Sequence, residues 1–221
     1  MKIEYEVFND REEAFKMLYN ILPTDEMKKE DWIILATSAA GVPIALNLAK
    51  KLNTKFDFLF TEKIYTSKNN ECEIAIITET GEIVVHEELL KSFSLNLEAI
   101  YLEANELYQT ILQEYKGKYR EKLDIMNLAD KNVLLVDEGL NTGLTMMACI
   151  KSVINEGAKS ICVAVPILPQ ATINDIETIA DDLYYVQSPA HFVSIDFYYD
   201  KLEQIELKDI KKLLEEFKKE N

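Results

Sequence analysis

The chain is poor in glycine, proline, cysteine and histidine, and each shortage removes a class of protein. It has 6 glycines and 5 prolines in 221 residues, unlike a disordered chain or a loop-rich scaffold. Its three cysteines, Cys72, Cys149 and Cys162, form no CxxC pair and are odd in number, which does not suit a disulfide framework. With only 2 histidines, the chain also lacks the usual ligands of a structural zinc site.

Long apolar runs and positive charge are also scarce. No apolar stretch approaches the ~20 residues that span a bilayer, and the first residues lack the apolar core of a signal peptide. We therefore expect a cytoplasmic protein. The formal net charge of −15 repels nucleic acid and anionic membranes, so we expect neither as a partner. The charge does not argue against a small-molecule substrate, which we expect, because backbone N–H groups and a metal can bind a polyanion locally. A homodimer is the default expectation for assembly.

The hydrophobic residues, 48% of the chain, suffice for one core, so residues 1–221 are expected to form a single domain. Continuous apolar strands alternate with helical patterns, which predicts an α/β fold with a mostly parallel sheet covered on both faces. The predicted strands of this sheet are 32–36, 56–60, 133–136, 160–165 and 183–186. A hairpin is expected at 73–85, an amphipathic and broken helix at 87–115, and a closing helix at 207–219.

The segment after the strand at 133–136 carries the chemistry. Asp137 and Glu138 come first, and a loop with Gly139 and Gly143 then leads to a helix that begins near Thr145. Ligands of open parallel sheets bind beyond the carboxyl ends of the strands. Glycines let backbone N–H groups approach phosphate oxygens, the helix start adds a favourable dipole, and carboxylates accept hydrogen bonds from vicinal hydroxyls. The segment therefore predicts a site for a phosphorylated ribose.

Two other interpretations of this segment are less specific. Asp137 and Glu138 alone could simply be exposed acids in a chain with 39 acidic residues. The combined run of strand, acids, glycines, threonines and helix is far more specific. A nucleoside triphosphatase loop is disfavoured, because the Gly-Lys-Ser/Thr end is missing.

The run at 133–145 resembles the 5-phosphoribosyl-1-pyrophosphate (PRPP) motif of type I phosphoribosyltransferases. The resemblance covers roughly residues 30–200 and is greatest to a group of bacterial members whose substrate is unassigned. Weaker matches lie at 40–43, 62–64, 119–120, 164–166 and 188–192. The resemblance implies a Rossmann-like doubly wound sheet with a small hood, into which the hairpin and long helix, about 71–118, are inserted.

The resemblance also implies roles for particular residues. Asp137 and Glu138 would face the ribose and hold Mg²⁺ indirectly. The PRPP-binding set would be Asp137, Glu138, Gly139, Leu140, Asn141, Thr142, Gly143, Leu144 and Thr145. The pyrophosphate loop would be Thr37, Ser38, Ala39, Ala40 and Gly41, and a mobile catalytic loop would include Tyr119, Arg120 and Lys122. Lys63 is a further candidate for the pyrophosphate end, so the catalytic candidates are Asp137, Glu138, Lys63 and Arg120.

One departure from the related group leaves three functions open. Relatives often have Arg-Gly-Gly where this chain has Ser38, Ala39 and Ala40, which removes a bidentate pyrophosphate donor. The first function is a Mg²⁺-dependent transferase that joins the phosphoribosyl group to a nitrogenous base and releases pyrophosphate. The second is a non-catalytic sensor of PRPP or a nucleotide. A hydrolase or phosphorolytic enzyme ranks last, because the sequence shows no dedicated base for it.

Overall fold

A five-stranded parallel sheet forms the centre of the computed structural model, which describes residues 5–66, 69–120 and 124–220. The strand order is β2-β1-β6-β7-β8. The strands are β1 (Trp32–Ala36), β2 (Lys55–Phe58), β6 (Asn132–Val136), β7 (Ser160–Ile167) and β8 (Asp182–Gln187). All four neighbouring pairs are parallel, as the continuous apolar runs predict.

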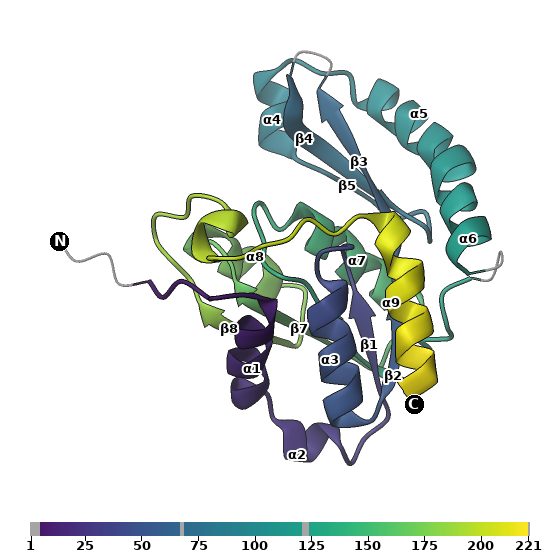
Figure 1. The fold of residues 1–221 in the computed structure, drawn as a ribbon. Helices are drawn as coiled ribbons and strands as arrows, with labels where there is room; N and C mark the ends of the chain where they lie inside the picture. Colours follow the sequence, from purple (N-terminus) through teal and green to yellow (C-terminus); the bar gives the residue numbers. More distant parts are fainter. Residues whose placement is uncertain (1–4, 67–68, 121–123, 221) are drawn as a thin grey trace.

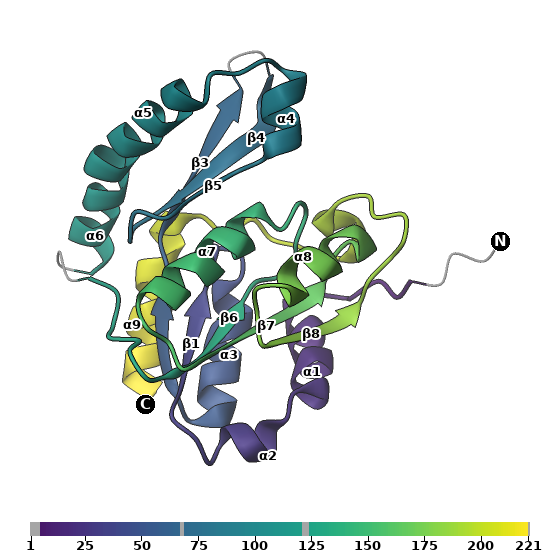
Figure 2. The same ribbon diagram turned by 180° about the vertical axis from the view of Figure 1, so that it is seen from behind.

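Helices cover both faces of this sheet (Figures 1 and 2). On one face lie α1 (Arg11–Ile21), α3 (Val42–Leu52) and α9 (Leu207–Glu220), and on the other lie α7 (Leu144–Asn155) and α8 (Ile173–Glu177). The short α2 (Thr24–Met27) leads into β1. None of the helices within the described ranges is long and apolar enough to cross a membrane.

The central sheet has a separate hydrophobic core on each face. Successive residues of a strand point to opposite faces, so alternate residues of the buried strands belong to different cores. In β1, Ile34 packs with the α1 and α3 side, whereas Ile33 and Leu35 pack with the α7 and α8 side. In β6, Leu134 belongs to the first core and Leu135 to the second. Every residue of β1 and β6 is buried, so the ends of these strands are fixed in place.

A smaller antiparallel sheet, in the order β3-β4-β5, stands above the carboxyl ends of the central strands (Figure 1). Its strands are β3 (Thr61–Thr66), β4 (Asn69–Thr78) and β5 (Ile83–Val85). It continues into α4 (Glu87–Ser92), α5 (Leu97–Leu107), a π-helical turn (Tyr108–Leu112) and α6 (Gln113–Tyr119). We call residues 61–66 and 69–120 the hood. The predicted hairpin is the β4–β5 pair, and the predicted broken helix is the series from α4 to α6.

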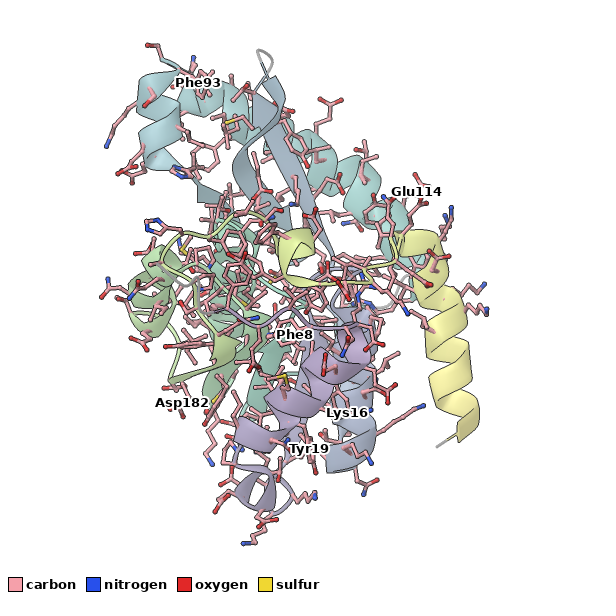
Figure 3. The ribbon with its side chains drawn as sticks, turned by 60° about the vertical axis from the view of Figure 1, so that its left-hand side comes forward. Phe8, Lys16, Tyr19, Phe93, Glu114 and Asp182 are labelled. Atoms are coloured by element: carbon pink, nitrogen blue, oxygen red, sulfur yellow. The ribbon has the colours of Figure 1, made fainter. Side chains whose placement is uncertain are left out.

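Figure 3 adds the side chains to the hood and to the central unit, which is the five-stranded sheet with its covering helices. In that view Phe93 and Glu114 mark the hood, and Phe8, Lys16, Tyr19 and Asp182 mark the central unit. Hydrogen bonds join the hood to α7: Ser152 Oγ lies 2.8 Å from the hydroxyls of both Thr78 and Thr80, and Asn155 Nδ2 donates to Glu82 Oε1 at 2.5 Å. Helix α7, whose first residues belong to the 137–145 segment, is thus bonded to the hood that faces this segment.

Candidate active site

The cavity between the hood and the central sheet has a volume of about 500 Å³. Residues 137–145, all of the predicted PRPP-binding set, line its floor. Hood residues that line it, which we call the roof, are Thr61, Lys63, Tyr65, Cys72, Glu73 and Leu89; Ser38, Met146 and Ile195 complete the lining. The structure therefore gathers the whole sequence motif and part of the hood into one site.

Asp137 is held firmly at the end of β6. Its Oδ2 accepts a hydrogen bond from Thr37 Oγ1 at 2.7 Å, and its Oδ1 accepts from Ser38 Oγ at 2.5 Å and from the Glu138 backbone N–H at 2.8 Å. Burial raises the pKa of Asp137, and the bonds from Ser38 and Thr37 oppose that rise. The side chain is thus oriented before any ligand binds.

Gly41 explains why the chain after β1 can come so close to Asp137. A Cβ atom at Gly41 would lie 2.8 Å from Asp137 Cα and 2.9 Å from its Oδ1. Any larger residue would collide with backbone there, so glycine is required by the close approach.

Glu138 is anchored through both its side chain and its backbone. Arg11 Nε donates to Glu138 Oε2 at 2.7 Å, and Tyr199 Oη donates to the Glu138 carbonyl at 2.7 Å. Burial raises the pKa of the Glu138 carboxyl, and the neighbouring Arg11 charge lowers it. Neither Arg11 nor Tyr199 was predicted as a site residue. Arg11 is 127 positions from Glu138 and Tyr199 is 61 positions from it, so no local sequence pattern links them.

The floor ends at the start of α7. Gly143 precedes the helix with φ +75°, a left-handed conformation that glycine adopts without strain. Thr142 Oγ1 accepts from the Leu144 N–H at 3.3 Å. The first N–H groups of a helix have no partner within it, so those of Thr145 and Met146 are available to an anion at this end of α7.

Lys63 reaches the cavity from β3. Its Nζ lies 2.7 Å from Glu73 Oε2. Burial opposes its charge, but Glu73 and, more weakly, Asp137 outweigh that effect and raise the pKa of Lys63. Lys63 is the one lysine or arginine among the described residues that line the cavity.

The pyrophosphate loop predicted at 37–41 reaches the cavity only through Ser38. Thr37 is fully buried and points to Asp137, and Gly41 is buried against the same residue. Ala39 and Ala40 are partly buried and do not line the cavity. The loop thus supports Asp137 as well as bordering the cavity.

Arg120 does not line the cavity. Its guanidinium stacks 4.5 Å from the centre of the Phe60 ring, donates to the Phe58 carbonyl at 2.9 Å and pairs with Glu79. The guanidinium also lies 3.7 Å from Asp57. The structure thus places Arg120 in a buried cluster between the hood and β2, away from the other predicted catalytic residues; Lys122 lies outside the described residues.

The comparisons with known proteins agree with this architecture. The family model described as "Phosphoribosyl transferase domain" matches residues 12–201. The chain belongs to the phosphoribosyl transferase family. The family that residues 133–145 resemble is thereby confirmed, and so is the α/β fold predicted from the alternating strand and helix patterns.

Individual relatives give the degree of similarity. Two proteins from strains of Mycobacterium tuberculosis, each named "Putative phosphoribosyl transferase", are 27% identical to this chain over 190 residues. The match covers 86% of this chain and 42% of each relative, so the chain spans about two fifths of the length of these curated relatives. The crystal structure of TT1426 from Thermus thermophilus has 22% identity and a TM-score of 0.75, over 96% of this chain and 99% of that chain. This likeness concerns the fold.

Proposed function

We propose that the cavity binds PRPP together with Mg²⁺, and that the chain transfers the phosphoribosyl group to a nitrogenous base with release of pyrophosphate. One observation carries the proposal: all of residues 137–145 line one wall of a single cavity that ends at the start of α7. This wall offers two carboxylates at one end and free helix N–H groups at the other, matching a ribose and its 5′-phosphate.

Each end of the floor has a part in the proposed reaction. The backbone N–H groups of Thr145 and Met146 would bind the 5′-phosphate, and Asp137 and Glu138 would accept hydrogen bonds from the ribose hydroxyls. Displacement of pyrophosphate places positive charge on the ribose ring, and two fixed carboxylates below the ring would stabilise it. Lys63, at the roof, would bind the departing pyrophosphate.

The residues fit a Mg²⁺ ion that is held indirectly. The oxygens of Asp137 already accept from Thr37, Ser38 and Glu138, and Glu138 Oε2 accepts from Arg11. Within the described ranges no group of three His, Cys, Asp or Glu side chains could hold a metal. Mg²⁺ in enzymes keeps several waters and is held by one or two carboxylates plus substrate phosphates, so Asp137 and Glu138 would bind it through water. When bound, it would neutralise charge on the leaving pyrophosphate.

A second function, a non-catalytic sensor of PRPP or a nucleotide, is favoured by one observation. Residues 38–40 carry no cationic side chain, and Lys63 is engaged with Glu73. The pyrophosphate end therefore has fewer donors than the phosphate end. A sensor needs only binding, whereas a transferase must also stabilise the leaving group.

A pyrophosphate-release assay distinguishes these functions. The protein is incubated with PRPP, Mg²⁺ and each member of a panel of purine and pyrimidine bases, and PRPP binding is measured by calorimetry in parallel. Base-dependent pyrophosphate release supports the transferase. Binding of PRPP without release for any base supports the sensor. Absence of PRPP binding contradicts the transferase and a sensor of PRPP.

A further inference from the structure

The proposed PRPP site occupies the floor of the cavity and leaves the hood residues of the roof without a ligand. If residues 137–145 bind the ribose and its phosphate, a second substrate must enter between this floor and the hood. The polar side chains that the roof presents there come from β3 and β4: Thr61, Lys63, Tyr65 and Glu73. Among these four, Glu73 alone carries an acceptor with negative charge.

Glu73 reaches the roof because of an irregularity in the hood sheet. Ile64 pairs with Ala75, but the next residue of β3, Tyr65, pairs with Glu73. One step along β3 therefore corresponds to two steps along β4, and Ile74 is the extra residue, as in a β-bulge.

Because of this extra residue, Glu73 and Ile74 lie on the opposite faces of β4 from those that regular alternation would give them. In a regular strand, Glu73 would share a face with Ala75 and Ile77, which pack with Ile64 in the apolar cluster below α5. Instead Ile74 occupies that cluster and is 3% exposed, while Glu73 lies beside Tyr65 on the cavity side. The bulge thus buries an isoleucine and turns a carboxylate toward the site.

In the structure Glu73 forms an ion pair with Lys63, the residue proposed to bind pyrophosphate. Lys63 Nζ lies 2.7 Å from Glu73 Oε2, and the Glu73 side chain is 14% exposed. A diphosphate carries more charge than one carboxylate and would draw Lys63 to itself. Glu73 would then be left in a half-enclosed cavity without its cation, a state that is unfavourable unless hydrogen-bond donors replace it.

We propose that Glu73 is the specificity-determining residue for the acceptor and selects a heterocycle whose edge carries an amino group beside a ring N–H. A carboxylate accepts two parallel hydrogen bonds from such an edge, and the ring of Tyr65, which is 40% exposed, offers a face for stacking. This inference rests on the proposed function, since it assigns the floor to PRPP. The donor edge would take the place that Lys63 leaves.

The test uses matched heterocycles and two variants. Guanine and xanthine differ at ring position 2, an amino donor in guanine and a carbonyl acceptor in xanthine, and at the adjoining ring nitrogen, which carries a hydrogen in xanthine only. The bases 2-aminopyrimidin-4-one and uracil form a second pair with the same differences. Binding of each is measured by calorimetry in the presence of Mg²⁺ and pyrophosphate or PRPP, on wild type, Glu73→Gln and Glu62→Gln. Glu62 is the matched control, because it is a partly buried hood carboxylate on the neighbouring strand that does not line the cavity.

Wild type and Glu62→Gln are expected to favour the donor-edge member of at least one pair by about tenfold or more, as bonds to a charged acceptor do. Glu73→Gln is expected to abolish that preference and to bind PRPP alone ~2–5-fold more tightly, because Lys63 is released. An unchanged preference in Glu73→Gln, a preference for the acceptor edge, or no binding of any member by a wild-type protein that binds PRPP would overturn the assignment. Failure of wild type to bind PRPP would instead overturn the proposed function.

Discussion

Replacing Arg120 by alanine tests whether this residue stabilises the fold. Its guanidinium, with a side chain 12% exposed, pairs with Glu79, whose side chain is 1% exposed. Glu79 also accepts a hydrogen bond from the Phe60 N–H at 2.9 Å. In Arg120→Ala the Glu79 carboxylate would stay buried without a cation. Loss of one partner of a buried pair lowers the free energy of unfolding by about 3–5 kcal/mol, a large part of the 5–15 kcal/mol or so that a domain has.

The assay is urea unfolding followed by the fluorescence of Trp32, the single tryptophan, which lies in the core at 9% exposure. The matched control is Lys91→Ala, which removes an exposed pair with Glu87 and should shift the midpoint far less. The double variant Glu79→Leu/Arg120→Met removes both charges and should lose less stability than Arg120→Ala alone.

The pH dependence of the same loss gives an independent readout. Burial raises the pKa of Glu79, and Arg120 opposes this rise, so removal of Arg120 should raise it further. A carboxyl whose pKa is raised on folding stabilises the fold at low pH and loses that contribution as the pH rises through its folded value. The deficit of Arg120→Ala should therefore be smaller at pH 5 than at pH 8. A deficit no larger than that of Lys91→Ala would refute the buried pair and favour the catalytic-loop interpretation of Arg120.

Three further predictions concern the site. Gly41→Ala should destabilise the fold by about 1–3 kcal/mol, because the new Cβ meets Asp137 backbone at 2.8 Å; thermal unfolding measures this, and an unchanged melting temperature would contradict the close approach. Asp137→Asn should unfold at higher urea than wild type at pH 8, with a difference that shrinks toward pH 4.5, because burial raises the pKa of Asp137; a difference that grows on acidification would be the wrong sign. Under native conditions Cys72 should react first with iodoacetamide, because burial raises the pKa of the Cys149 thiol and that of Cys162 to about 11; mass spectrometry should also show that PRPP protects Cys72, which lines the cavity.

The central sheet and the floor of the site were predictable from the sequence. The apolar runs at β1, β6 and β7 are buried on both faces, so their composition alone indicates a parallel sheet. Asp137, Glu138 and the following glycines are consecutive, and the geometry of a strand, loop and helix brings consecutive residues to one edge. Local pattern and tertiary position therefore coincide at this segment.

The roof and the supports of the floor were not predictable in the same way. Arg11 reaches Glu138 across 127 positions, a contact that only the packing of α1 against the sheet creates. Regular alternation along β4 would place Glu73 on the face away from the cavity. The bulge that turns it toward the cavity adds one residue, which periodicity does not reveal. Arg120 lies near a segment that is polar in sequence, yet its side chain turns inward to Glu79.

The measurement that tests the central claim most directly is a calorimetric titration of PRPP, with and without Mg²⁺, into wild type and Asp137→Asn. Asp137 lines the cavity and is held by three hydrogen bonds, so its loss should weaken PRPP binding by about tenfold or more, and omission of Mg²⁺ should weaken binding to wild type. Equal affinity of the two proteins for PRPP would contradict the assignment of residues 137–145 as the phosphoribosyl site.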